Sequence, residues 1–217
     1  MNVIAFVTQK GGAGKSTLAA CLGVAAEAAG EKVFLLDLDP QQSLLGWGKK
    51  RQAETPPVDA AAPSKLAEAL NALERSGYTL VILDTAGHDS PAATAAMRGA
   101  DLCLIPSRPT AFDVMATKPT RDAVDKLSKP YLFILNQCPP GHRGSRALDG
   151  QRALEMMGVV AMPPIITRVD FQEAAVQGLG VNEINPGGKA AEEIDGLWQT
   201  VKKNLQGGMT HGDRKAG

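Results

Sequence analysis

The fold of this chain is decided by residues 3–17, which read VIAFVTQKGGAGKST. Residues 3–7 are apolar and mostly β-branched or aromatic, which is typical of a strand buried on both faces. Three glycines then fall within four residues, and Lys15 and Ser16 open a run of helix-forming residues that extends to Ala29. A strand, a glycine-rich loop, a Lys-Ser pair and a helix in this order predict a phosphate-binding loop.

The residue types in this loop suit an anion. Glycines let backbone N–H groups turn inward without a Cβ in the way, and these groups favour a phosphate together with the helix N-terminus. Lys15 brings a mobile positive charge for the β- and γ-phosphate oxygens, and the Ser16 hydroxyl suits Mg²⁺. A glycine-rich turn that binds nothing would leave the lysine unexplained. The predicted phosphate-binding residues are Gly11, Gly12, Ala13, Gly14, Lys15, Ser16 and Thr17.

A second predicted strand, residues 32–36, ends in the acidic segment DLDPQQS at residues 37–43. Because α/β sheets place their chemistry at strand ends, we expect one of these aspartates to hold Mg²⁺ through water or to position the attacking water in phosphoryl transfer. An Asx-turn that caps the next helix is the alternative role for Asp39, and it can coexist with catalysis.

A third predicted strand, residues 78–83, ends in Asp84, and Gly87 follows shortly after. A strand that ends in aspartate is common by itself, but after a phosphate-binding loop it indicates the second acidic motif of a nucleotide hydrolase. We therefore expect Asp84 to reach Mg²⁺ through its waters and the Gly87 amide to contact a γ-phosphate.

The loop departs in one position from the general pattern G-x-x-x-x-G-K-[ST], because Gln9 stands where the first glycine would be. A second lysine, Lys10, comes directly before the glycines, and KGGAGKST fits K-G-G-x-G-K-[ST]-[ST]. Here the sequence resembles the deviant Walker A ATPases of the ParA/MinD family. The resemblance implies that Lys10 crosses a dimer interface to touch phosphates bound by the other subunit, and that Asp39 takes part in hydrolysis. A solvated lysine beside an anion site is the alternative for Lys10.

The base of the nucleotide is predicted from the end of a strand at residues 131–136. Asn136 resembles the family's adenine-contacting asparagine, whereas a guanine site of the N-K-x-D type would need a lysine and an aspartate where the chain has Gln137 and Pro139. ATP is therefore favoured over GTP. The family also places base and dimer contacts after a later proline, and Arg168 is the candidate on this chain.

Alternating strands and helices with near-continuous apolar strands predict a single α/β domain over residues 1–206. We expect a mostly parallel, twisted sheet covered by helices on both faces, the P-loop NTPase fold, and a flexible tail at residues 207–217. The remaining predicted strands are residues 101–106 and 158–162. Five further helices are predicted at residues 43–51, 65–75, 91–99, 146–157 and 189–205. Two more are predicted without a fixed end: one that starts at Phe112 and contains Pro119, and one that the chain enters near Phe171. Residues 52–63 and 176–188 are predicted connections.

Composition limits the functional classes. Lysine plus arginine and aspartate plus glutamate both total 23, so the net charge is zero and any nucleic-acid binding needs a local patch. Cys21, Cys103 and Cys138 lie far apart, which argues against a zinc or iron–sulfur site within one chain and suits a reducing compartment. A core strand that begins at Val3 leaves no room for a signal peptide, and no apolar run approaches the roughly 18 residues of a membrane span. We expect a cytoplasmic protein.

The resemblance also implies a function. In the ParA-like family, ATP closes a sandwich homodimer, the dimer binds DNA without sequence preference, and a ParB-like or adaptor partner stimulates slow hydrolysis. The cycle positions or segregates a plasmid, a chromosome or a large protein assembly, with the ATP-bound form on the nucleoid and no membrane partner. DNA contacts would come from cations pooled by two subunits. The candidates are Arg143, Arg146, Arg152, Lys189, Lys202 and Lys203.

Four alternatives are open to the same sequence. A MinD-like membrane-cycling ATPase would need a last helix that lies on lipid, but acidic residues in the first half of that helix favour docking on the core. An iron–sulfur carrier would need positioned cysteines, and a metabolic enzyme that couples ATP to a small acid would need a second substrate pocket that nothing in the sequence marks. A module that binds nucleotide only as a structural element would not need Asp39 and Asp84.

Overall fold

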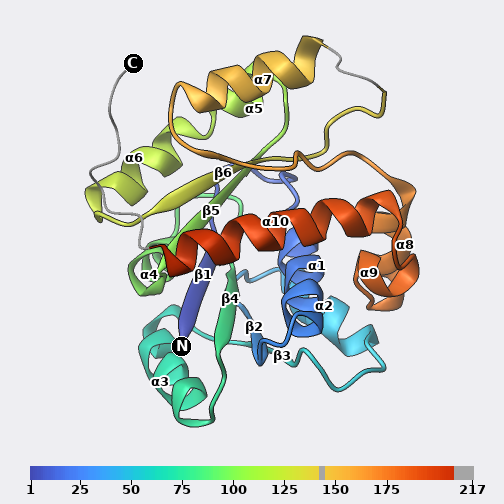
Figure 1. Cartoon of the computed structure of the whole chain (residues 1–217). Helices are drawn as coiled ribbons and strands as arrows, with labels where there is room; N and C mark the ends of the chain where they lie inside the picture. Colours follow the sequence, from blue (N-terminus) through green and yellow to red (C-terminus); the bar gives the residue numbers. More distant parts are fainter. Residues whose placement is uncertain (142–144, 208–217) are drawn as a thin grey trace.

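Seven parallel strands form one sheet in the order β3-β2-β4-β1-β5-β6-β7 (Figure 1). The structure is a computed structural model that describes residues 1–141 and 145–207. The strands are β1 Asn2–Phe6, β2 Val33–Asp37, β3 Val58–Ala60, β4 Leu80–Asp84, β5 Leu102–Ser107, β6 Tyr131–Leu135 and β7 Val160–Ala161. The predicted parallel α/β fold is therefore confirmed.

Helices cover both faces of this sheet, as its apolar strands require. One face carries α1 Lys15–Ala28, α2 Ser43–Lys50, α8 Val169–Gln177, α9 Val181–Ile184 and α10 Lys189–Gln206. The other face carries α3 Leu66–Arg75, α4 Pro91–Gly99, α5 Ala111–Met115, α6 Lys118–Lys126 and α7 Ser145–Glu155, with the 3₁₀-helix η1 Pro63–Lys65 before α3. Figure 1 shows α10 lying across the sheet beside α1.

Side chains of the central strand alternate between two cores. In β1, Ile4 and Phe6 belong to the core under α1 and α10, whereas Val3 and Ala5, with Val7 just after the strand, belong to the core on the opposite face. All are buried, so the apolar run that opens the chain forms the middle of the molecule and fixes the loop that follows it.

The last helix packs on the protein core, as predicted. Ile194, Leu197, Trp198 and Val201 of α10 are at most 2% exposed, so the apolar face that a membrane-cycling ATPase would lay on lipid is covered by the chain itself. Among the described residues, no helix combines the length and the apolar character needed to cross a bilayer. Apart from Gly207, the predicted tail lies outside the described residues.

Three local predictions need correction. The connection at residues 52–63 contains β3, which extends the sheet beside β2 by three residues and follows Pro56 and Pro57. The predicted helix from Phe112 is two helices, because Pro119 stands in the first turn of α6, where its missing N–H costs no hydrogen bond. The connection at residues 176–188 contains the short helix α9.

Candidate nucleotide-binding site

The sheet brings the phosphate-binding loop and the acidic strand ends to one edge. Asp84, the last residue of β4, is the register partner both of Phe6 in β1 and of Asp37 in β2. The loop that follows β1 therefore begins next to two carboxylates, at the carboxyl edge where parallel sheets bind ligands.

The loop has the backbone conformation that its glycines permit. Gly12 has φ +75° and Gly14 has φ +89°, values in the left-handed region that favours glycine. Gly14 is the N-cap of α1, and no acidic residue lies in the first turn of that helix. The first N–H groups of α1 thus meet no competing carboxylate on their own helix, which leaves the positive end of a 14-residue helix for an anion.

Two side-chain amides that follow β6 donate hydrogen bonds to carbonyl groups of the phosphate-binding loop. Asn136 Nδ2 donates to the Ala13 carbonyl at 2.8 Å, and Gln137 Nε2 donates to the Gly12 carbonyl at 3.0 Å. Asn136 was expected to contact a base, and the structure gives it this additional role, which nothing in the sequence indicated. Its contact with a base stays a prediction.

The Lys15 ammonium and the Asp84 carboxylate are both buried at the bottom of the site. Burial lowers the pKa of Lys15, while the charges of Asp84 and Asp39 act to raise it. Burial raises the pKa of Asp84 to about 7, against the lowering effect of the Ser16 hydroxyl and Lys15. Neither Asp84 oxygen receives a hydrogen bond of normal geometry from the described residues. Since buried carboxylate oxygens are rarely left without partners, the residues here fit a hydrated cation such as Mg²⁺.

A magnesium site of this type does not need a cage made only of protein. Mg²⁺ is usually bound by one or two carboxylates, water and the phosphates of a nucleotide. Within residues 1–141 and 145–207 there is no cluster of three or more His, Cys, Asp or Glu side chains able to hold a metal. The assignment of Ser16, Asp39 and Asp84 as donors to a metal that arrives with its nucleotide stays a prediction.

The two aspartates at the end of β2 have different roles. Asp37 Oδ1 accepts the Asp39 N–H at 2.9 Å, and Asp37 Oδ2 accepts the Leu45 N–H of α2 at 2.9 Å. The helix-capping role considered for Asp39 thus belongs to Asp37, whose buried carboxylate organises the loop. Asp39 is half-buried, and its Oδ1 accepts the Gln41 N–H at 2.9 Å in an Asx-turn. The turn role of Asp39 is confirmed and leaves its catalytic role as a prediction.

Gly87 lies directly against the phosphate-binding loop. A Cβ at Gly87 would lie 2.7 Å from Gly11 Cα and 2.8 Å from Gly11 N. The Thr85 hydroxyl also donates to the Phe6 carbonyl at 2.8 Å, which ties the segment after β4 to the end of β1. The two loops thus touch backbone to backbone at the place where a γ-phosphate contact was predicted.

A cavity of about 330 Å³ opens beside the loop, between α1 and α8. Its walls include Asn136 and Arg168, so the structure brings together the two residues predicted near the base. Arg168 Nη2 lies 2.5 Å from Glu193 of α10, whose second carboxylate oxygen accepts the Ile166 N–H at 3.1 Å. Phe171 also lines this cavity and was not identified from the sequence, since an aromatic residue on a helix normally indicates only core packing.

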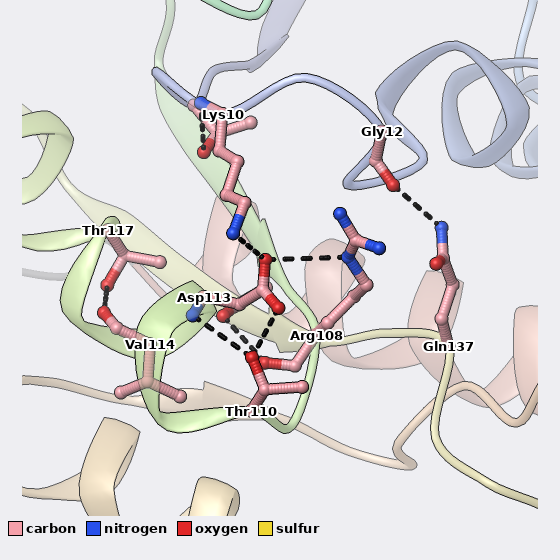
Figure 2. A network of polar contacts seen from close by, with 10 residues as sticks. Lys10, Gly12, Arg108, Thr110, Asp113, Val114, Thr117 and Gln137 are labelled. Atoms are coloured by element: carbon pink, nitrogen blue, oxygen red, sulfur yellow. Dashed lines mark hydrogen bonds and ion pairs between the residues drawn. The ribbon is translucent and has the colours of Figure 1, made fainter.

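Lys10 lies at the outer side of the loop and points to α5 (Figure 2). Its ammonium is 2.7 Å from Asp113 Oδ1 of the same chain. Because of this ion pair, Lys10 is not a lysine surrounded only by solvent. The predicted contact of Lys10 with the partner's phosphates stays a prediction.

The four candidate DNA-binding residues whose side chains the structure describes do not form one patch on a single subunit. Arg152 belongs to α7, whereas Lys189, Lys202 and Lys203 belong to α10 on the opposite face of the sheet. Lys202 also forms an ion pair with Glu31 at 3.3 Å. Arg143 and the side chain of Arg146 lie outside the described part of the chain.

All three cysteines are buried as free thiols. Burial raises the pKa of Cys21 and Cys103 to about 12 and that of Cys138 to about 11. They behave as small core residues, which disfavours the iron–sulfur alternative.

Comparison with known proteins agrees with this geometry. The family described as CobQ/CobB/MinD/ParA nucleotide binding domain matches residues 4–207. Maintenance of carboxysome distribution protein A from Gloeobacter kilaueensis is 33% identical over 209 residues, or 94% of each chain. Protein ParA from Rhizobium radiobacter is 35% identical over 181 residues, covering 79% of this chain and 81% of that protein. The solved structure of the septum site-determining protein MinD complexed with Mg-ADP from Pyrococcus horikoshii has the same fold, with a TM-score of 0.76 at 22% identity over 93% of this chain and 96% of that one. This chain therefore belongs to the CobQ/CobB/MinD/ParA family of nucleotide-binding domains, whose ParA and MinD members are P-loop ATPases.

Proposed function

We propose that this protein is an ATP-dependent, dimerising switch ATPase that positions or segregates a cargo through nucleotide-controlled, nonspecific DNA binding. The observation that carries the proposal is the convergence of Lys15, Asp39 and Asp84 on the glycine loop at one edge of the sheet. This constellation has the parts that phosphoryl transfer needs, namely a phosphate cradle, a cation partner and a residue to orient water.

The chain would bind ATP with the phosphates on residues 11–17 and the base in the 330 Å³ cavity. Lys15 and the N–H groups of α1 would hold the phosphates, and Gly87 would approach the γ-phosphate from the neighbouring loop. Ser16 and Asp84 would hold Mg²⁺, with Asp39 nearby, and the metal would neutralise phosphate charge when bound. Asn136 and Arg168 would contact the nucleotide from the walls of the cavity.

Hydrolysis would depend on Asp39. The Asx-turn fixes its position through Oδ1, and its charge is felt by both Lys15 and Asp84. A carboxylate fixed beside the phosphate-binding loop can orient a water molecule with little need for a strong base, which agrees with a slow reaction that a partner protein accelerates.

ATP binding would promote a homodimer in which Lys10 of each subunit reaches the other subunit's phosphates. The dimer would pool lysines and arginines that are dispersed on one subunit, bind DNA without sequence preference, and release it when a ParB-like or adaptor protein stimulates hydrolysis. We propose a cytoplasmic protein that is on the nucleoid in its ATP form. The relatives named for carboxysome distribution and for ParA cover most of this chain, which supports a protein assembly or a plasmid as cargo.

The test is nucleotide-dependent assembly and DNA binding of the Asp39→Ala protein, with size-exclusion chromatography on the same samples. With Mg-ATP but not Mg-ADP, this variant should be a dimer that binds unrelated duplexes equally and more weakly as salt rises. Asp59→Ala, a substitution on the exposed side of β3, is the matched control and should turn over ATP like the unmodified protein. A dimer that ignores DNA would contradict the DNA step, and a variant that stays monomeric would contradict the switch itself.

A further inference from the structure

Lys10 and Arg108 share one carboxylate oxygen beside the phosphate-binding loop (Figure 2). Lys10 Nζ lies 2.7 Å from Asp113 Oδ1, and Arg108 Nε lies 3.4 Å from the same atom. The other oxygen, Oδ2, accepts a hydrogen bond from the Thr110 hydroxyl, whose oxygen accepts the Asp113 N–H at 3.2 Å. Asp113 is therefore fixed at the start of α5 while two cations converge on its Oδ1.

Asp113 needs a cation beside it. Its side chain is only 9% exposed, whereas those of Lys10 and Arg108 are 36% and 37% exposed. Burial alone would raise the pKa of Asp113, but the hydrogen bonds from Lys10 and Thr110 and the charge of Arg108 hold it below its usual value. A nearly buried, ionised carboxylate that lost every partner would be strongly destabilising.

Arg108 is placed to be that partner if Lys10 leaves. Its Nε is buried and makes no hydrogen bond of normal geometry, so its contact with Asp113 is incomplete while Lys10 occupies Oδ1. Its guanidinium also packs on the loop, since Nη2 would be 3.5 Å from a Cβ on Gly12. A small movement of Arg108 toward Oδ1 would complete the pair.

We propose that Asp113 is a positioning residue that holds Lys10 within its own subunit until ATP-dependent dimerisation, and that Arg108 takes over Asp113 Oδ1 when Lys10 crosses to the partner subunit. The inference rests on the proposed function, in which Lys10 acts on the partner's phosphates. One ammonium cannot occupy both places, so the ion pair within the subunit opposes the dimer. Arg108 lowers the cost of release because it keeps Asp113 neutralised.

The first test measures the ion pair in the nucleotide-free protein, where no dimer is involved. Competitive acetylation with acetic anhydride, read by mass spectrometry, compares Lys10 with the exposed Lys65 in the same sample. Asp113→Asn should speed the labelling of Lys10 by about threefold or more, because the loss of a partly buried ion pair frees the ammonium. Asp122→Asn, which removes a carboxylate paired with Arg121 on α6, is the matched control and should leave Lys10 unchanged. Equal labelling of Lys10 in Asp113→Asn and the unmodified protein would overturn the proposal.

The second test measures dimerisation by sedimentation in Mg-ATP, with every variant built on Asp39→Ala to prevent hydrolysis. Asp113→Asn should lower the protein concentration for half-dimerisation by about three- to tenfold, and Arg108→Gln should raise it, because Asp113 then depends on Lys10 alone. In the double variant the effect of Arg108→Gln should disappear. Should Asp113→Asn not fold, Arg108→Gln still decides the matter, since dimerisation at an unchanged or lower concentration would overturn the proposal.

The two failures can be told apart. If the Asp39→Ala parent dimerises with ATP but Asp113→Asn shifts nothing, the holding role of Asp113 is wrong and the proposed function stands. If the parent does not dimerise at all, the proposed function is wrong. The holding role of Asp113 is then wrong too, even if the labelling of Lys10 shows that the ion pair exists.

Discussion

A Cβ on Gly14 would lie 2.4 Å from Asn136 Nδ2, so the phosphate-binding loop and the end of β6 meet at a point that only glycine can occupy without displacement of the amide. The same amide nitrogen donates to the Ala13 carbonyl, across a sequence separation of 123 residues. The curvature of the loop thus depends on β6 as well as on the loop's own glycines.

Asn136→Ala should lower ATP affinity by about 5- to 30-fold, because the Ala13 carbonyl loses its partner at a cost of about 1–2 kcal/mol. Titration with a fluorescent ATP analogue measures the affinity, and urea unfolding without nucleotide measures stability. Gln137→Ala, which removes the more exposed amide, should have the smaller effect on both. A loss of affinity with unchanged stability would show that Asn136 contacts only the base.

Lys15→Ala should abolish ATP binding, since the variant lacks an ammonium that is buried in the site. Isothermal titration with Mg-ATP measures the effect. Lys65→Ala, at an exposed position in η1, is the matched control and should bind normally. Retained affinity in Lys15→Ala would contradict the assignment of the phosphate cradle.

Lys10→Ala should leave ATP binding by the monomer intact and impair dimerisation and hydrolysis. The reason is that Lys10 points to α5 and pairs with Asp113 in its own subunit, so its contribution to catalysis would come only from the partner subunit. Titration of nucleotide and sedimentation of the same samples separate the two effects. Normal turnover in this variant would remove the evidence for a role in trans.

Gly87→Ala should destabilise the protein by about 1–3 kcal/mol, because the new methyl group would overlap the backbone of the phosphate-binding loop. ATP affinity should fall with it, since Gly11 must move. Gly46→Ala in α2 is the control, with open space around the new methyl group, and should be neutral or stabilising by up to about 1 kcal/mol. Equal unfolding midpoints for Gly87→Ala and the unmodified protein would argue against the close approach of the two loops.

The cysteine thiols should not react with an aromatic disulfide reagent in the folded protein at pH 9, and should all react in urea. Unfolded thiols ionise at about pH 8.5, whereas burial raises the pKa of Cys21 and Cys103 to about 12 and that of Cys138 to about 11. Because the folded state keeps these protons to higher pH, ionisation of the thiols favours unfolding as the pH rises above about 8.5. Rapid reaction of any thiol in the native protein would show that its region opens.

The fold and the phosphate-binding loop were predictable because their signals are local. The apolar residues of β1, the glycines and Lys15 are adjacent in sequence, and each strand end places its aspartate at a known edge of the sheet. The helix that contains Trp198 was likewise assigned to the core from its own pattern, and its burial confirms this.

The remaining features depend on contacts between distant segments. No residue near Asp37 indicates that the Leu45 N–H donates to the Asp37 carboxylate and not to that of Asp39. Which carboxylate accepts this hydrogen bond depends on the path of the chain from β2 to α2. The partners of Lys10 were not predictable because Arg108 and Asp113 come from the segment after β5, far from Lys10 in the sequence. The strand β3 was missed because it has only three residues, which follow two prolines. A segment this short cannot show the alternation of apolar and polar residues that predicts a strand.

The cavity beside the phosphate-binding loop is closed by residues from the last part of the chain. Glu193 accepts the Ile166 N–H and pairs with Arg168, so α10 holds the wall that faces Asn136. During synthesis on the ribosome, the glycine loop emerges first and this wall emerges last. Under the proposed function, a nascent chain that ends before Glu193 would have the cradle for phosphates without the support for a base, so tight ATP binding would mark a chain whose translation has passed Glu193.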